Sequence, residues 1–252
     1  TLGAFGEAAT SGSEILLISS ESPIKNRSKE GTRGILHEMN DQSAIFTPLA
    51  KRVSIGGNEL VLAKSTTTAI DAISTVVDFL EFLAQAPTGA GYIGIPSDIL
   101  NQDFTEQVPA PSKNCVDFIN QEKNLKIDQE LIKKALEGVN KIGIWAGGGA
   151  QGISEEITKL SEHLNAPIFT SFAGRGVGSA SKNYLTIPIH EVEAEQVLSQ
   201  CEALLVFGSQ LDGMNTKNWG VNFPQKIIIF DANPCITLRN IKADLVVRTA
   251  DL

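Results

Sequence analysis

Three consecutive glycines, Gly147 to Gly149, have the type and position most suited to binding chemistry. They follow a short apolar run, Lys141 to Ala146, and precede a segment of helical periodicity that starts near Ser154. At a strand-to-helix turn, backbone N–H groups and the helix dipole favour an anion such as a phosphate. Glycines there also permit positive φ angles and close packing of helix on strand. We therefore expect a structural turn first, and weak phosphate binding or none second.

The glycine spacing by itself is a poor indicator of a dinucleotide site. Gly147, Gly149 and Gly152 fit G-x-G-x-x-G, a pattern that is common by chance. The acidic residue expected about 20 positions later, which would bind a ribose, does not occur because that stretch reads IFTSF. Arg175, in the loop after the next apolar run, is the best candidate to neutralise a diphosphate. N–H groups at the helix start should remain unpaired by the helix itself.

Histidine and cysteine, which often bind metals or act in catalysis, are few and dispersed. The chain has three of each, with no C-x-x-C pair and no G-x-S-x-G turn. The sequence therefore indicates no metal site, no disulfide framework and no catalytic triad. We expect His163 and His190 on the surface. The odd number of widely spaced cysteines fits a reducing cytoplasm.

Charge and hydropathy exclude further classes of protein. The formal net charge is −8 and the pI is near 5.0, which disfavours nucleic acid and anionic lipid as partners. The most apolar helical window, 69–86, contains three acidic residues, so we expect no membrane span.

Short apolar runs alternate with helical patterns along the chain. Seven runs are continuously apolar, as in parallel strands buried on both faces: 15–19, 92–96, 141–146, 167–171, 203–208, 226–231 and 244–248. Helical periodicity covers 68–86, 128–139, 154–164 and 191–201, with Asp128 a candidate N-cap. The alternation predicts an α/β fold with parallel sheets flanked by helices.

The spacing of these elements predicts two domains. Residues 104–125 are rich in proline and polar residues and are typical of a surface linker. Residues 126–252 contain enough strand–helix units for a complete Rossmann-like domain. Residues 1–103 contain only two clear strands and one long helix, and the chain opens TLGAFGEAA without an initiator methionine. We therefore expect the second half of a domain whose first half lies upstream, with apolar surface exposed around Val76, Val77, Phe79 and Leu80.

Six segments occur in order and at suitable spacing along the chain. They are DQSAIFTPLAKRV, GYIGIPSDIL, GIWAGGGAQG, APIFTSFAGRGV, ALLVFGSQLD and IIIFDANP. With these segments the chain resembles, over nearly its whole length, the thiamine-diphosphate enzymes of the acetolactate synthase, benzoylformate decarboxylase and benzaldehyde lyase group. Lys51 ends a family pattern P-x-[TV]-K, from which Ala50 departs. The resemblance implies that 1–103 is the C-terminal half of a pyrimidine-binding domain and 126–252 the central, nucleotide-binding-like domain.

The resemblance also implies an activity. It implies a decarboxylase or carboligase acting on a 2-oxo acid, acetolactate synthase-like first and a simple decarboxylase or aldehyde lyase next. The implied cofactors are thiamine diphosphate and magnesium, and the implied assembly is a homodimer or homotetramer in the cytoplasm. The family's ylid-forming glutamate would lie upstream of Thr1, and the GDG…N segment that holds magnesium does not occur. We therefore expect this chain alone to be inactive.

His37 and Glu38 are the candidate catalytic residues of this chain, because their segment borders the active-site cleft in the family. A solvated loop is the competing interpretation, and the family more often has glutamine where Glu38 stands. We expect Lys51 to be a structural ion-pair partner rather than a base.

Flavin-containing members of the family bind FAD in the central domain. They do so through the glycine loop (Gly147, Gly148, Gly149) and through segments that match Ser171, Phe172, Gly208, Ser209 and Asp231 in this chain. With Arg175, these are the candidate cofactor-binding residues. Such members also carry an arginine where Thr47 stands, a GMHG segment, and an R-x-D-D-R turn where this chain has SQLDG. These departures argue against intact FAD and favour an ADP-like ligand.

Two other classes of function stay open at this point. One is a free-standing FAD- or nucleotide-binding module, and the other is a non-catalytic interaction protein on the same fold. The first would need a sheet that is complete without an upstream piece, and flavin absorbance of the purified protein would reveal it.

Overall fold

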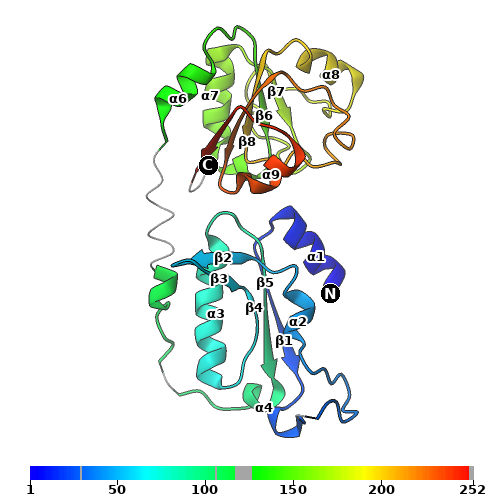
Figure 1. Cartoon of the computed structure of the whole chain (residues 1–252), viewed down its shortest axis with the longest axis vertical. Coiled ribbons are helices and arrows are strands. Elements are labelled where there is room, and N and C mark those ends of the chain that lie inside the picture. Colours follow the sequence, from blue (N-terminus) through cyan, green and yellow to red (C-terminus); the bar gives the residue numbers. More distant parts are fainter. Residues whose placement is uncertain (29, 106, 117–126, 250–252) are drawn as a thin grey trace. The chain divides into compact units, whose positions relative to one another are not determined.

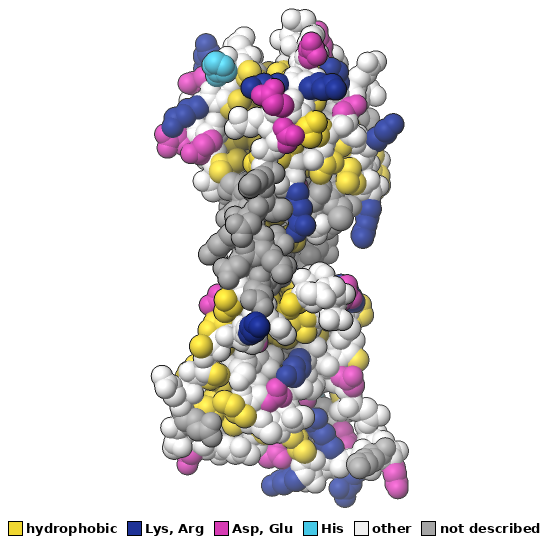
Figure 2. Space-filling model, turned by 60° about the vertical axis from the view of Figure 1, so that its left-hand side comes forward, with side chains coloured by type: hydrophobic (Ala, Val, Ile, Leu, Met, Phe, Trp, Pro, Cys, Tyr) yellow, Lys and Arg dark blue, Asp and Glu magenta, His cyan; other side chains and the backbone are white. Residues whose placement is uncertain are grey.

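A computed structural model describes residues 1–28, 30–105, 107–116 and 127–249 of the 252-residue chain (Figure 1). The chain divides into two compact units, Thr1–Asn124 and Leu125–Leu252, and each is described by itself. Acidic and basic side chains are interspersed on the face shown in Figure 2. Among the described helices, none is both long and apolar enough to cross a membrane.

The first unit contains a sheet of three parallel strands in the order β1-β5-β4, formed by Ile15–Glu21, Ala90–Pro96 and Ala63–Ser65. Every residue of the central strand β5 is buried, which explains its unbroken apolar sequence. A separate antiparallel hairpin joins β2 (Arg52–Ile55) to β3 (Asn58–Val61). Its turn residues Gly56 and Gly57 both have positive φ, as a two-residue hairpin loop requires.

Helices cover both faces of this small sheet. Helix α3 (Ala69–Ala84) begins after Thr68, whose Oγ1 accepts a hydrogen bond from the Asp71 N–H, and it packs Phe79 and Phe82 against the sheet. The other core cluster combines α1 (Leu2–Ser11), α2 (Ser43–Phe46) and β5, where the rings of Phe46 and Tyr92 stack at 4.0 Å. The 3-10 turn η1 (Ile24–Asn26) and α4 (Ser97–Leu100) complete the unit.

The second unit is built on five parallel strands in the order β10-β9-β8-β6-β7. The strands are β6 (Ile142–Ala146), β7 (Ile168–Thr170), β8 (Ala203–Phe207), β9 (Lys226–Asp231) and β10 (Leu245–Arg248). The helical segments are α6 (Gln129–Ala135), the 3-10 turn η2 (Gly148–Ile153), α7 (Ser154–Leu164), α8 (Val192–Leu198) and α9 (Pro234–Asn240). Asp128 caps α6, as expected, by accepting from the N–H groups of Glu130 and Leu131.

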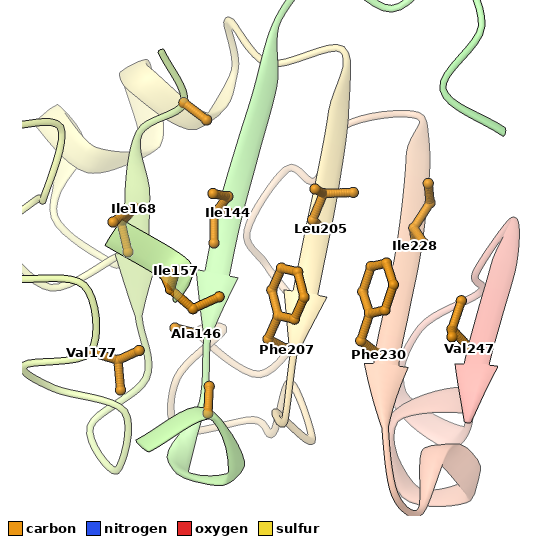
Figure 3. Close-up of a cluster of buried hydrophobic side chains, with 12 residues drawn as sticks. Ile144, Ala146, Ile157, Ile168, Val177, Leu205, Phe207, Ile228, Phe230 and Val247 are labelled. Carbon is orange, nitrogen blue, oxygen red and sulfur yellow. The ribbon is translucent and has the colours of Figure 1, made fainter. Parts of the chain in front are cut away.

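Two apolar cores lie on opposite faces of the five-stranded sheet. On one face, alternate residues of all five strands pack with Ile157 of α7, and the rings of Phe207 and Phe230 stack at 4.6 Å (Figure 3). On the other face, Trp145 and its neighbours pack with Leu198 of α8. The five-stranded sheet therefore has a helix packed on each face, α7 on one and α8 on the other.

The predicted fold class is confirmed: both parallel sheets are flanked by helices, and all seven expected strands form. Strands β2, β3 and β4 and helices α1, α2, α4 and α9 were not expected. Of the expected linker 104–125, residues 106 and 117–125 lie outside the described residues. Within its described part, Cys115 is fully buried in the core beside α3. In α3 itself, Leu80 is 50% exposed as expected, but the expectation for Phe79 is wrong because it is 3% exposed.

Candidate functional site

The expected cofactor residues lie at one edge of the five-stranded sheet. The chain passes from β6 to β7 on one side of β6 and then crosses to β8 on its other side. In open parallel sheets, ligands bind beyond the carboxyl ends of the strands at such a switch point. The candidate residues follow or end these strands: Gly147, Gly148 and Gly149 after β6, Ser171, Phe172 and Arg175 after β7, Gly208 and Ser209 after β8, and Asp231 at the end of β9.

The glycine loop is required for close packing rather than for backbone conformation. The expectation of positive φ is wrong for Gly147 to Gly149; Gly147 itself has φ −96°. A Cβ added to Gly147 would lie 2.1 Å from the Gly208 carbonyl oxygen, and one on Gly149 would lie 3.0 Å from Gly208 Cα. Gly208 is the residue that adopts a left-handed conformation, with φ +54°. The loops after β6 and β8 therefore touch backbone to backbone.

Hydrogen bonds within this contact occupy groups that a phosphate would need. The Gly147 N–H donates to the Phe207 carbonyl at 2.8 Å, and the Gly149 N–H donates to the Gly208 carbonyl at 3.0 Å. The Ala150 N–H donates to the Gly147 carbonyl, because the 3-10 turn η2 begins within the glycine loop at Gly148. These three N–H groups of the loop are therefore not free to bind a phosphate, and the expectation of unpaired N–H groups concerned the helix start near Ser154 instead.

The first residue of α7 is also hydrogen-bonded to a neighbouring loop. The Ser154 hydroxyl oxygen accepts from the Gly178 N–H at 3.0 Å, so it ties a neighbouring loop to the helix. No side chain caps the first turn of α7 at its N-cap residue, Ile153. Ser154 therefore begins the helix, as expected, but its side chain serves packing between loops.

Ser209 is part of the same closed contact. Its Oγ accepts from the Trp145 Nε1–H at 3.0 Å and from the Leu211 N–H at 3.3 Å, and its carbonyl accepts from Thr237. Ser171 is also buried, and its Oγ accepts from the Gly174 N–H at 3.0 Å. The polar side-chain atoms of Ser209 and Ser171 are therefore already hydrogen-bonded within the chain.

A shallow notch remains at the end of β7. Its lining includes Phe172, Arg175, His190 and Asn215. Arg175 donates to the Thr186 carbonyl at 2.7 Å, while the ring of Phe172 is half exposed and lies 6.0 Å from the His190 ring. His190 was expected on the surface, and the structure places it partly buried beside Phe172. Asn215 was missed because its contact, Oδ1 accepting from the Phe172 N–H, joins loops far apart in sequence.

Asp231 is the one carboxyl group among the candidate cofactor residues, and it is partly buried. Burial raises the pKa of Asp231 from its usual value, and the hydrogen bond from the Asn233 N–H offsets this only in part. A carboxyl group can exchange hydrogen bonds with a hydroxyl group, whereas its negative charge when ionised repels a phosphate.

The candidate catalytic pair lies on a loop of the first unit. His37 is exposed with φ 61°. Glu38 accepts from the N–H groups of Arg33 at 2.6 Å and Ile35 at 3.1 Å, which closes the loop. Burial acts to raise the pKa of Glu38, but the hydrogen bonds from Ile35 and Arg33 outweigh it and lower the pKa. A carboxylate with a lowered pKa is a weak general base, which favours the solvated-loop interpretation.

Lys51 is buried and performs a structural task. Its ammonium group donates to the carbonyl of Gln85 at 2.7 Å and to that of Phe82. These carbonyls lie at the end of α3, where a cation also complements the helix dipole.

A buried polar network at the carboxyl edge of the first sheet was not predicted. Glu21 ends β1, and its side chain is 4% exposed. It accepts from Ser65 at 2.6 Å and pairs with Arg27 at 2.9 Å. The carboxylate lies over β5, where a Cβ added to Gly94 would be 1.8 Å from it. Burial and this carboxylate both raise the pKa of the nearby Tyr92. The network could not be predicted from the sequence, because an acidic residue after an apolar run is usually an exposed loop residue.

Carboxylate, histidine and cysteine side chains are the candidate ligands for a metal ion in this chain. No group of three or more His, Cys, Asp or Glu residues in the described part of the chain is arranged to hold a metal ion. The sequence also contains no GDG segment. Magnesium prefers several hard oxygen ligands.

Comparison with known proteins indicates which family this fold resembles. The model of the thiamine pyrophosphate enzyme central domain matches residues 130–250, which span the five-stranded sheet. Residues 130–250 are therefore similar to the central domain of thiamine pyrophosphate enzymes. Among solved structures, a proposed thiamin diphosphate-dependent enzyme from Mycobacterium smegmatis superposes with a TM-score of 0.70 at 13% identity, over 97% of this chain and 45% of that one. At this identity the likeness concerns the fold.

The sequence relatives within the thiamine pyrophosphate enzyme family are acetolactate synthases. The large subunit from Buchnera aphidicola subsp. Acyrthosiphon pisum is 28% identical over 162 residues, 61% of this chain and 28% of that protein. The probable large subunit from Methanocaldococcus jannaschii is 26% identical over 167 residues, 62% of this chain and 28% of that protein. The aligned part of this chain therefore covers under a third of the length of these relatives.

Proposed function

We propose that this chain is part of a thiamine-diphosphate-dependent decarboxylase or carboligase that acts on a 2-oxo acid, with acetolactate synthase-like activity as the first expectation. The observation that carries the proposal is the central-domain match over 130–250 together with sequence relatives that are acetolactate synthase large subunits. The six ordered sequence segments support the same assignment.

The first unit is proposed to be the C-terminal half of a pyrimidine-binding domain. Its three parallel strands are few for a sheet of this class, and β1 pairs with a neighbour on one side only in the described residues. Thiamine diphosphate and magnesium are then cofactors of a complete enzyme, in which polypeptide outside these residues supplies the glutamate and the metal ligands. We propose a cytoplasmic homodimer or homotetramer for that enzyme.

In this proposal the chain contributes scaffold rather than reacting groups. Glu38 and Lys51 are engaged in closing a loop and holding the end of α3, so neither is assigned a proton transfer. The filled crevice between the glycine loop and Gly208 argues against a free-standing nucleotide-binding module. We propose that neither FAD nor ADP binds there tightly.

The test is product analysis with the protein from the whole open reading frame. Incubated with pyruvate, thiamine diphosphate and magnesium, it should form acetolactate, and omission of thiamine diphosphate should abolish the product. Light scattering should show a dimer or larger assembly. Release of acetaldehyde instead would move the assignment to a simple decarboxylase. No thiamine-dependent consumption of pyruvate or benzoylformate would contradict the proposal.

A further inference from the structure

The second unit has a hollow of about 590 Å³ on the edge of its sheet opposite the glycine loop. Its lining residues precede or begin three neighbouring strands: Asn140 and Ile142 at β6, Pro167 at β7, and Gln200 and Cys201 at β8. Small-molecule sites commonly have volumes of several hundred Å³. This hollow therefore has the size of a ligand site, at the edge of the sheet opposite the candidate cofactor residues.

The rim of the hollow is basic. Lys141 and Lys182 both line it, and no Asp or Glu does. Neither lysine forms an ion pair with any described residue, whereas three other lysines each pair with a glutamate: Lys133, Lys159 and Lys217. The nearest identified carboxylate is Glu202, held beside the rim by the Asn140 N–H at 2.7 Å. In a chain of net charge −8, two unpaired ammonium groups at one hollow mark a local anion-binding position.

Capping of helix ends does not account for these lysines. Lysines near a helix C-terminus often bind its last carbonyls. Here the carbonyl of Ser161, near the end of α7, already accepts from the Asn165 N–H and from the Asn183 side chain. The carbonyl of Leu198, at the end of α8, accepts from the Cys201 N–H at 2.9 Å. These carbonyls at the two helix ends are therefore bonded without either ammonium group.

The wall of the hollow is mixed, with amide side chains beside an apolar part. Ile142, Leu185 and Val197 all line it, and each is partly buried against one of the two cores of the unit. An inorganic anion would leave this apolar surface in contact with water. An anion with an organic body would cover it and gain hydrophobic stabilisation.

We propose that this hollow binds a small organic carboxylate. The carboxylate lies between Lys141 and Lys182, and the apolar body of the ligand packs on Ile142, Leu185 and Val197. The site belongs to the second unit alone and does not depend on thiamine chemistry. Its failure would therefore leave the proposed function untouched.

The test uses anilinonaphthalene sulfonate, a fluorescent organic anion, titrated into the purified chain. One saturable site is expected, from which benzoate displaces the dye and inorganic phosphate does not. The double variant Lys141→Gln/Lys182→Gln should bind roughly three- to tenfold more weakly, since exposed charge pairs each contribute modestly. Lys133→Gln/Lys159→Gln removes the same charge from α6 and α7 and should stay within about twofold of the unaltered chain.

Three results would overturn the proposal. The first is no saturable binding of the dye, and the second is equal weakening of dye binding in both glutamine double variants. The third is displacement of the dye by phosphate but not by benzoate. All four lysines are exposed, so folding should persist, and circular dichroism checks it. Lys141→Arg/Lys182→Arg keeps both charges and should retain binding; loss of binding in this variant as well would also count against the site.

Discussion

Gly147→Ala tests whether the glycine loop exists for packing or for a ligand. The added methyl group would lie 2.1 Å from the Gly208 carbonyl oxygen and 2.6 Å from Ser209 Cα. Both are backbone atoms, and one of them would have to move by more than about 1 Å to restore contact distance. The same carbonyl accepts from the Gly149 N–H at 3.0 Å, so its movement also weakens that bond.

The magnitude follows from these two effects. Overpacking of a rigid site costs about 1 to 3 kcal/mol, and a weakened hydrogen bond adds about 1 kcal/mol. We expect Gly147→Ala to lower the free energy of unfolding by about 3 kcal/mol, and the melting temperature of the second unit by roughly 10 °C. Urea and thermal denaturation without any ligand measure both.

Gly148→Ala is the matched control. Its added methyl group would lie 3.1 Å from the Ala173 side chain, and Gly148 does not have a positive φ. We expect a change within about 1 kcal/mol, because a methyl neighbour can shift and alanine restricts the unfolded chain. If Gly147→Ala changed the free energy of unfolding by less than about 0.5 kcal/mol, yet abolished measurable FAD or ADP binding, the packing account of this loop would be refuted.

Three further perturbations probe buried groups. Lys51→Met should lower the free energy of unfolding by roughly 2 kcal/mol, because two carbonyls lose their donor. Lys64→Met removes an exposed ion pair and should lower it by less than about 1 kcal/mol. Equal losses for the two variants in urea denaturation would contradict the structural role of Lys51. The raised pKa of Asp231 means that the folded chain holds this proton more tightly than the unfolded chain. The free energy of unfolding should therefore fall as pH rises from 3.8 through the raised pKa, and Asp231→Asn should remove this fall. The same dependence of unfolding free energy on pH in the variant and the unaltered chain would refute this prediction. Burial raises the pKa of Cys115 and Cys201 to about 11. At neutral pH, iodoacetamide should therefore alkylate both thiols on the order of 100-fold more slowly than free cysteine, as measured by peptide mapping. Rapid labelling of either thiol would contradict its burial.

The central strands were predictable from sequence because they are buried on both faces. Runs such as Ile142–Ala146 and Ala203–Phe207 are continuously apolar, a pattern that flanking helices on both sides produce. Arg52–Val61 was missed because its hairpin mixes polar and apolar residues and is mostly exposed. Helix α1 was missed because Gly3 and Gly6 weaken its helical pattern.

The chemistry of the candidate site was less predictable than its position. The candidate cofactor residues come from the resemblance, and the structure brings them to one edge of the five-stranded sheet. The reason for the glycines depends on the Gly208 carbonyl, and the burial of Ser209 depends on a hydrogen bond from Trp145. Such contacts join residues about 60 positions apart, as sheet crossovers do, and no local spacing encodes them.

Carbon dioxide release tests the proposed role of this chain most directly. The complete gene product and the 252-residue chain are assayed in parallel with pyruvate or benzoylformate, with and without thiamine diphosphate and magnesium. The account predicts cofactor-dependent release from the complete protein and none from the chain alone, whose described residues offer no metal-binding cluster. Cofactor-dependent release from the isolated chain, or none from the complete protein, would contradict it.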